Sequence, residues 1–448
     1  MDLSLSSNYD FLPRYFRLAI ANVLSNIMVP LANLVSAIFL GHLSEIHHLT
    51  GVALAGNILN FLYFTLLFLR MGTTGVTAQA VGQDDREGVL LVGLRNGLLA
   101  LPLGIVIIVL QYPLGELVFS TLSIEPEVLA SAKAYFHNQI WGAPAILLNF
   151  VLLGWFLGQE KNTLVVSLSV GGNLTKIAFD YLFIIYLGWA SAGAGISYAI
   201  SQYISLLVGF IFLLKIVQWQ EIKALAGKIL DLNAMCSSLT LNGDIFVGNL
   251  AMFSAALLFN YEGAQLGTII YTQNALLLQI FNFSLYLVTG LGFGTETLVG
   301  NIQGKGLKEQ LKPLGEVSVI VAVLIGLFFG GMSCLFPDAV FSLLTDHAEV
   351  IEGINIFVPW LLLVLIFGSI SFTLNGYFLG LAQGVILRNS SLIALVGFLP
   401  TLIVAVKFES NHILWLALLF LDAINAIILG VQMPKTWLTE ESSLPMAE

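Results

Sequence analysis

Twelve apolar runs of about 20 residues dominate this sequence and restrict the folds that it can adopt. Each run is long enough for a helix that crosses the roughly 30 Å hydrocarbon core of a bilayer. The runs lack the short alternating pattern of membrane barrel strands, so the sequence predicts an all-α integral membrane protein. Hydrophobic residues make up 58% of the 448 residues and charged residues only 10%, which excludes an ordinary soluble domain.

The basic residues indicate how these runs are oriented in the membrane. The runs cover about 17–40, 50–72, 90–112, 135–157, 163–187, 192–214, 240–260, 266–294, 314–336, 354–380, 385–406 and 411–432. With a cytoplasmic N-terminus, twelve Lys and Arg residues face the cytoplasm and only Lys133 and Lys407 face outward. Cytoplasmic loops carry such an excess of Lys and Arg, so we expect both termini inside.

An internal repeat relates the two halves of the chain. Residues that include Phe119, Gly154 and Gly158 recur 222 positions later, whereas Gly72 and its neighbours recur at an offset of 218, which suggests a four-residue insertion. Six spans is an even number, so the repeats are parallel and related by a pseudo-twofold axis along the membrane normal. The predicted parts are an N-terminal lobe (1–220), a cytoplasmic linker with a partly amphipathic helix (221–239) and a C-terminal lobe (240–448).

Folds of this kind commonly bind cargo near the membrane midplane between the halves and expose it to each side in turn. The repeat therefore predicts a secondary transporter. We expect a small-molecule substrate and a lipid environment. No basic patch interleaved with aromatic residues indicates a nucleic-acid partner.

A charged pair, Lys176 and Asp180, interrupts the fifth apolar run. Each ionisable group at bilayer depth costs about 2.5–3.5 kcal/mol on insertion scales, so such a pair is a candidate functional site. Residues four apart on a helix share a face, and the two side chains can neutralise each other. The pair is therefore either part of an ion-coupling site or a stabilising ion pair.

Four segments carry a family resemblance: PLANLVSAIFLGHL, LFLRMGTTGVTAQAVGQDD, NFVLLGWFLGQEKN and GGNLTKIAFDYLFIIYLGW. In their order and spacing they resemble the multidrug and toxic compound extrusion (MATE) transporters, in particular the DNA-damage-inducible F-like branch. The resemblance covers essentially the full length. It implies two six-helix lobes, a plasma or bacterial inner membrane location, and export of organic, often cationic molecules in exchange for protons or sodium ions. We expect a monomer without a cofactor.

The chain departs from that family at the positions linked to ion coupling. Ser36 stands where relatives usually have an acidic residue before Gly-His-Leu, and Lys176 stands where they usually have Asn, whereas Asn173 is retained. If Lys176 reaches Asp180, we expect the carboxylate to stay ionised and to carry protons poorly. The hypothesis is that the cation switch of this lobe is frozen or altered, and the alternative is a purely structural pair. Coupling would then move to Asp422 in the twelfth span, whose alternative role is a hydrogen bond to a neighbouring helix.

A polar and aromatic face on the second span suits an amphiphilic ligand, because a cationic group can lie over an aromatic ring. The candidate substrate-binding residues are Asn57, Asn60, Phe61, Phe64, Gln279, Asn282 and Tyr286. The 218 offset pairs Phe61 with Gln279 and Phe64 with Asn282. Helix packing is the alternative role, since amides also join helices inside membranes.

Three other functional classes are the alternatives to a coupled exporter. A lipid-linked precursor flippase of the same superfamily should have a strongly cationic cavity, whereas an uncoupled or inactive descendant would bind cargo without ion dependence. A membrane enzyme is not expected, because no nucleophile elbow or phosphate loop occurs in the spans. His42, His47 and His48 cluster after the first span, where we expect a solvated loop, with a metal site as the alternative.

Overall fold

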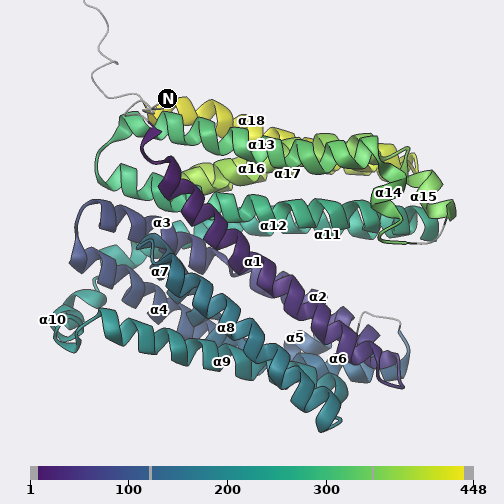
Figure 1. Cartoon of the computed structure of the whole chain (residues 1–448), viewed down its shortest axis with the longest axis horizontal. Coiled ribbons are helices and arrows are strands. Elements are labelled where there is room, and N and C mark those ends of the chain that lie inside the picture. Colours follow the sequence, from purple (N-terminus) through teal and green to yellow (C-terminus); the bar gives the residue numbers. More distant parts are fainter. Residues whose placement is uncertain (1–8, 121–123, 346–347, 438–448) are drawn as a thin grey trace, which may run out of the picture. The chain divides into compact units, whose positions relative to one another are not determined.

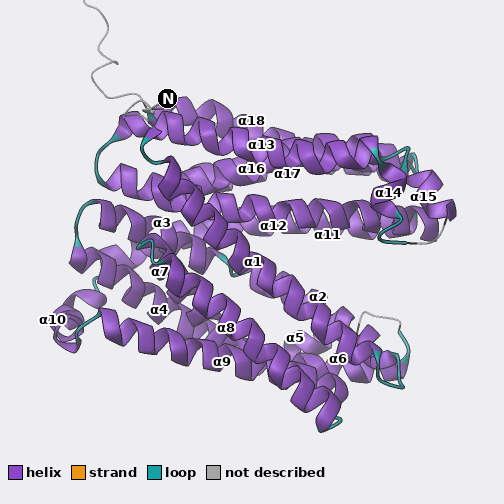
Figure 2. Cartoon of the chain, in the orientation of Figure 1, coloured by secondary structure: helices purple, strands orange, loops and turns teal. Residues whose placement is uncertain are grey.

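The computed structural model of the chain describes residues 9–120, 124–345 and 348–437, and every regular element in these ranges is a helix (Figures 1 and 2). Twelve helical segments of the described chain are long and apolar enough to cross a membrane, which confirms the predicted class and number. They are Leu12–Gly41, His47–Gly82, Arg86–Val109, Pro126–Gly158, Asn162–Tyr186, Ala190–Ile216, Leu232–Gln265, Thr268–Gly304, Lys308–Leu335, Val358–Gly380, Gly384–Lys407 and Asn411–Thr436.

The helices form two compact units, whose limits differ from the predicted lobes. The N-terminal unit spans Leu24–Leu239, and the C-terminal unit joins residues up to Val23 to those from Thr240 onward. Helices α1 (Leu12–Gly41) and α11 (Leu232–Gln265) therefore contribute to both units. The limit between residues 239 and 240 coincides with the predicted end of the linker, whereas the start of α1, which the prediction placed in the N-terminal lobe, belongs to the C-terminal unit.

The N-terminal unit contains the rest of α1 and a series of helices that pack around α7 and α9. They are α2 (His47–Thr65), α3 (Phe68–Gly82), α4 (Arg86–Val109), α5 (Gln111–Phe119), α6 (Pro126–Gln139), α7 (Ala143–Gly158), α8 (Asn162–Asp180), α9 (Ala190–Ile216) and α10 (Trp219–Ile229). A short 3-10 turn, Ile140–Gly142, joins α6 to α7, and a π-helical turn, Tyr181–Tyr186, follows α8.

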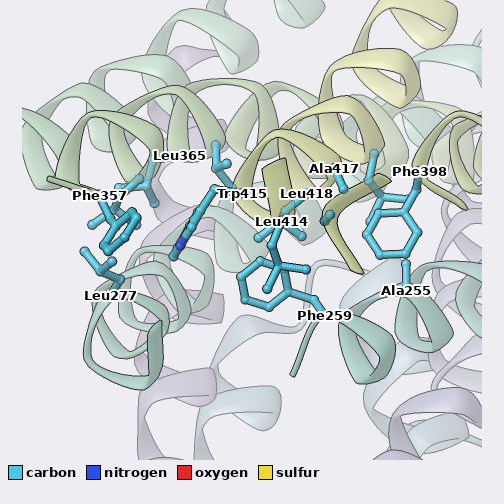
Figure 3. Packing of buried hydrophobic residues seen from close by; sticks show 14 of the residues in the cluster. Ala255, Phe259, Leu277, Phe357, Leu365, Phe398, Leu414, Trp415, Ala417 and Leu418 are labelled. Carbon is cyan, nitrogen blue, oxygen red and sulfur yellow. The ribbon is translucent and has the colours of Figure 1, made fainter. Parts of the chain in front are cut away.

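The C-terminal unit packs its helices around a continuous apolar core. Its helices after α11 are α12 (Thr268–Gly304), α13 (Leu311–Leu335), α14 (Pro337–Phe341), α15 (Ala348–Ile354), α16 (Val358–Gly380), α17 (Gly384–Lys407) and α18 (Asn411–Gln432). Figure 3 shows Trp415 of α18 among aromatic and aliphatic side chains that include Phe259, Leu277 and Phe357. The ring of Phe259 meets that of Trp415 edge to face, with centroids 5.3 Å apart. This core holds α18 against its neighbours.

The predicted amphipathic linker helix is present as α10, and it is bound to the N-terminal unit. A capping box between Gln218 and Glu221 starts the helix. Arg86 of α4 donates from Nε to Glu221 Oε1 at 3.0 Å, and Arg95 donates to the carbonyl oxygen of Lys228 at 2.8 Å. These contacts fasten both ends of α10 to α4.

Two glycines on α7 allow it to approach α3 at backbone distance. A Cβ built on Gly154 would lie 2.5 Å from the carbonyl oxygen of Arg70, and one built on Gly158 would lie 2.7 Å from that of Thr74. Small residues four apart let membrane helices pack this closely. The pair Gly154 and Gly158 therefore fixes where α7 crosses α3.

The C-terminal unit repeats this contact between α16 and α12. A Cβ on Gly376 would lie 2.3 Å from the carbonyl oxygen of Gly292, and one on Gly380 would lie 2.5 Å from that of Glu296. Gly376 and Gly380 are the predicted counterparts of the two glycines on α7. The internal repeat is thus expressed as the same helix contact in each unit.

The contacts also correct the register of the repeat near the start of each half. The carbonyl oxygens that face Gly154 and Gly376 belong to Arg70 and Gly292, which are 222 positions apart. Those that face Gly158 and Gly380 belong to Thr74 and Glu296, which are also 222 positions apart. The predicted offset of 218 and its four-residue insertion are therefore wrong for these helices. A slip of four residues is close to one helical turn, so it leaves the pattern of small residues on almost the same face.

Glycines also explain why the first turns of α1 belong to the C-terminal unit. A Cβ on Gly290 would lie 2.5 Å from Val23 Cγ2, and one on Gly294 would lie 3.2 Å from the Ala19 nitrogen. Without side chains at these two positions, α12 accommodates the start of α1. Residues up to Val23 are therefore held by α12 within that unit.

Candidate functional site

A buried charged cluster lies in the N-terminal unit, where α1, α8 and α9 meet. Lys176 Nζ donates to Asp180 Oδ2 at 2.8 Å, and the two side chains are 5% and 0% exposed. The hydroxyl of Ser36 contacts both Lys176 Nζ and Asp180 Oδ2, and Ser197 donates to Asp180 Oδ1. The structure thus joins the predicted pair and Ser36 in one cluster.

Local helix geometry sets this arrangement. Lys176 and Asp180 are one turn apart in α8, so their side chains lie on one face. Directly after Asp180 the helix widens into the π-helical turn Tyr181–Tyr186. Such turns inside α-helices are frequent at functional sites. The carboxylate therefore sits where α8 changes its winding.

The cluster leaves the Asp180 carboxylate fully engaged. One oxygen accepts from Ser197 and the other from Lys176, with Ser36 in contact with both charged groups. A buried carboxylate with a fixed ammonium beside it has its charge compensated inside the protein. The Lys176 ammonium thus compensates the charge of the Asp180 carboxylate at 2.8 Å.

Two residues of this region differ from the expectation. Ser197 of α9 is fully buried and binds Asp180, although the sequence analysis did not select it. The only signal was a small hydroxyl side chain in the next span. Asn173 is half-buried, and its amide donates to the Ser169 carbonyl oxygen of its own helix at 2.8 Å. The cluster is completed by a serine where the prediction placed an asparagine.

Asp422 occupies a different environment midway along α18. Its side chain is 3% exposed, and among the described residues Oδ2 has no hydrogen-bond partner. A Cβ built on Gly368 of α16 would lie 3.3 Å from Oδ2 and 3.4 Å from a ring carbon of Phe281. The carboxyl group therefore lies against Gly368, and the ring of Phe281 approaches the same glycine.

A neutral polar pair lies one turn beyond Asp422. Asn425 is fully buried, and its amide donates to Ser371 Oγ of α16 at 2.8 Å, whereas Oδ1 has no partner among the described residues. Asn425 thus provides the helix-joining hydrogen bond that was the alternative role for Asp422. Glu296 of α12 is also fully buried, because the eighth span continues past the predicted end at 294 to Gly304.

The predicted substrate-binding residues of α2 lie on its exposed side. Asn57 and Asn60 are exposed, Phe61 is half-buried and Phe64 is 43% exposed. The opposite side of the helix is buried and contains Gly51, Ala55, Leu59 and Tyr63. The four candidates therefore form one face that does not pack into the core of the N-terminal unit.

Helix α12 presents a chemically equivalent face in the C-terminal unit. Gln279 and Asn282 are exposed and Tyr286 is half-buried. Phe283, which the sequence analysis missed, is 52% exposed. With the register of 222, amides correspond to amides and aromatic rings to aromatic rings. The corrected pairs are Asn57 with Gln279, Asn60 with Asn282, Phe61 with Phe283, and Phe64 with Tyr286.

Sequence comparisons relate the whole chain to known transporters. A family model described as MatE matches residues 22–182 and 245–404, once in each half, in agreement with the internal repeat. The chain is 30% identical over 422 residues to DNA damage-inducible protein F of Escherichia coli K12, and the match covers 94% of this chain and 92% of that protein. It is 24% identical to multidrug and toxin extrusion protein 1 of Xenopus tropicalis, over 85% of this chain and 69% of that protein.

Solved structures share the fold. An outward-facing multidrug resistance MATE family transporter of the MOP superfamily matches with a TM-score of 0.85 at 20% identity, over 95% of this chain and 96% of that chain. A MOP superfamily transporter from Pyrococcus furiosus, described as having a binding pocket of reverse polarity, matches with a TM-score of 0.83 at 19% identity and the same coverage. This chain therefore belongs to the MatE family of multidrug and toxic compound extrusion transporters, and is an integral, multi-pass membrane protein.

Proposed function

We propose that this protein exports organic cationic or amphiphilic small molecules, in exchange for protons or sodium ions, by alternating access. The observation that carries the proposal is the repeated face of two amides and two aromatic rings on α2 and α12. Relatives named as multidrug and toxin extrusion or multidrug resistance proteins support the same class of cargo.

The chemistry of these faces suits such cargo. Amides within a membrane span usually face protein or a water-filled cavity, because lipid offers them no hydrogen-bond partner. Asn57, Asn60, Gln279 and Asn282 are all exposed, which favours a water-filled surface. The aromatic rings beside them can hold a cation through its attraction to the ring face, with a gain of about 0.5–2 kcal/mol.

We assign ion coupling to Asp422. An ionised carboxylate that is buried without a partner is costly, so this group needs a proton or a bound cation. Asp180 has no such need, because Lys176 already supplies a positive charge at 2.8 Å. In the proposed mechanism, uptake and release of the coupling ion at Asp422 drive the exchange, and the Lys176 and Asp180 pair stays intact.

The flippase alternative is less well supported. A carrier of anionic lipid-linked precursors needs uncompensated positive charge to attract its cargo. Lys176, a basic residue deep in an apolar run, is paired with Asp180, so the pair carries no net charge.

Transport in proteoliposomes tests the proposal. Vesicles containing the purified protein are loaded with a fluorescent organic cation, and a proton or a sodium gradient is imposed separately, beside protein-free vesicles. The proposal predicts that one gradient accelerates dye efflux. Dye movement that ignores both gradients would identify an uncoupled carrier, whereas transfer of a fluorescent lipid-linked anion in place of the dye would identify a flippase.

A further inference from the structure

A group of potential metal ligands lies between α1 and α2, away from the charged cluster of Asp180. The side chains of Glu45, His47 and His48 bring one ligand atom each to within 4.8 Å of one another. In the described part of the chain they are the one such group of three or more His, Cys, Asp or Glu residues. From the sequence alone, we expect a solvated loop at these residues.

The distances suit a tetrahedral transition-metal ion. Glu45 Oε2 lies 3.3 Å from His47 Nε2 and 3.4 Å from His48 Nε2. Zinc binds imidazole nitrogen and carboxylate oxygen at about 2.0–2.1 Å, so tetrahedral ligand atoms are about 3.3 Å apart. Two of the three ligand-to-ligand distances therefore already match a zinc site.

The second ring nitrogen of His48 is held by groups from two other helices. His48 Nδ1 lies 2.9 Å from Ser191 Oγ of α9 and 3.2 Å from Ser131 Oγ of α6. When Nδ1 carries the proton and donates to a serine, the Nε2 lone pair is directed toward Glu45. Histidine ligands of metals usually donate their other N–H in this way, which fixes the ring and its tautomer.

The site is open to an incoming ion. The His47 and His48 side chains are about one-fifth exposed, at 21% and 22%, and Glu45 is 61% exposed. The two histidines line a cleft of about 310 Å³ together with Glu127, Ser131, Trp189 and Ser191. Glu127 Oε2 lies 4.0 Å from His47 Nδ1, so a second carboxylate is close behind the other ring.

We propose that Glu45, His47 and His48 bind one divalent transition-metal ion such as Zn²⁺, with water in the remaining coordination position. Imidazole ligands favour Zn²⁺, Ni²⁺ or Cu²⁺ over Mg²⁺ or Ca²⁺, which prefer oxygen. The bound ion would tie the start of α2 to α6 and α9 through His48 and its serines. This proposal stands independently of the proposed transport function, because it concerns metal binding alone.

Calorimetric titration of the full-length protein in detergent tests the site. The protein is purified without a histidine tag and titrated with ZnCl₂ or MgCl₂, as wild type and as His47→Gln, His48→Gln and Glu45→Gln. His42→Gln is the matched control, because His42 Nδ1 instead lies 2.8 Å from the Ile38 carbonyl oxygen. We expect one Zn²⁺ per chain, no Mg²⁺ binding, an affinity at least about tenfold lower in each ligand variant, and no change in His42→Gln.

Thermal unfolding provides the second measurement. Zn²⁺ should raise the unfolding temperature of the wild type and of His42→Gln, but not that of the double variant His47→Gln/His48→Gln, because a ligand stabilises the state that binds it. Ser131→Ala should weaken binding less than loss of a ligand does. The proposal is overturned if the wild type does not bind Zn²⁺, or if the double variant binds it as tightly. If the double variant does not fold, Zn²⁺ binding by Glu45→Gln, a substitution at an exposed position, tests the proposal instead.

Discussion

The two units bury a carboxylate in contrasting ways, although their helices pack alike. In the N-terminal unit, Asp180 is surrounded by the Lys176 ammonium and two serine hydroxyls. In the C-terminal unit, Oδ2 of Asp422 lies against Gly368 without a hydrogen-bond partner among the described residues. One carboxylate has a counter-charge within the protein, whereas one oxygen of the other is buried without a hydrogen-bond partner among the described residues. This difference is the basis of our proposal that ion exchange takes place at Asp422.

The shared packing makes this contrast informative. The same glycine contact joins α7 to α3 and α16 to α12, so a common framework carries both sites. Two copies of one helix framework can differ in their buried acids. One copy can then hold an exchangeable ion, while the other holds a fixed positive charge. Substitutions at equivalent positions of the two units therefore distinguish the properties that both units share from the properties of one unit.

The largest expected effect comes from breaking the buried pair. Asp180→Asn leaves the Lys176 ammonium without its counter-charge, and removing one partner of a buried ion pair costs about 3–5 kcal/mol. The double variant Lys176→Met/Asp180→Leu should cost less than Asp180→Asn alone, because no charge is left buried. Unfolding by denaturant in detergent measures both. A double variant that loses at least as much stability as Asp180→Asn would contradict a coupled pair.

An intermediate effect is expected from the glycine contacts. Gly154→Ala and Gly376→Ala place a methyl group 2.5 and 2.3 Å from a carbonyl oxygen, and such overpacking costs about 1–3 kcal/mol. The controls Gly171→Ala and Gly331→Ala have no atom within 4 Å of the added Cβ, so they should be neutral or slightly stabilising. Unequal losses at Gly154 and Gly376 would weaken the equivalence of the two contacts.

A smaller effect is expected at the cargo faces. Phe64→Ala and Tyr286→Ala should each weaken binding of an organic cation by about 0.5–2 kcal/mol, roughly two- to thirtyfold. Equilibrium binding of a fluorescent cation measures this loss. Phe328→Ala is the control, because this ring is 61% exposed on α13, outside both faces. An equal loss in the control would show that any exposed ring affects dye binding.

The smallest effect is expected at the exposed ion pair of α10, which serves as a reference for the buried pair. Hydrogen bonds from Arg86 and from the Gln218 N–H hold the pKa of Glu221 below its ordinary value. The resulting stability is fully present above the unfolded pKa of about 4.3 and is lost as the pH falls through the lower folded pKa. The unfolding temperature of the wild type should therefore drop more on acidification than that of Glu221→Gln. Parallel profiles would show that the pair contributes nothing measurable.

The spans and the pairing of Lys176 with Asp180 could be predicted because both depend on local pattern. Long apolar runs need only length and composition, and a spacing of four on a helix places two side chains on one face. The partners from other helices, such as Ser197, depend on tertiary packing that spacing does not encode. The convergence of Glu45, His47 and His48 likewise depends on how each side chain turns.

The errors have physical reasons as well. The register of 218 was one helical turn from the correct one, so the faces looked alike, and the match of Asn57 with Gln279 was missed. The limit inside α1 was not predicted, because hydropathy is continuous along this helix and gives no boundary signal. Only the glycine contacts of α12 show where the start of α1 belongs.

The assignment of coupling to Asp422 is tested most directly by gradient-driven dye efflux from proteoliposomes. The variants are Asp422→Asn and the neutralised pair Lys176→Gln/Asp180→Asn, each checked for insertion and unfolding temperature. We predict that Asp422→Asn lowers gradient-driven efflux at least about tenfold, a loss of about 1.4 kcal/mol or more, whereas the neutralised pair retains most of it. Efflux that survives Asp422→Asn and disappears in the neutralised pair would contradict this assignment and return coupling to the N-terminal unit.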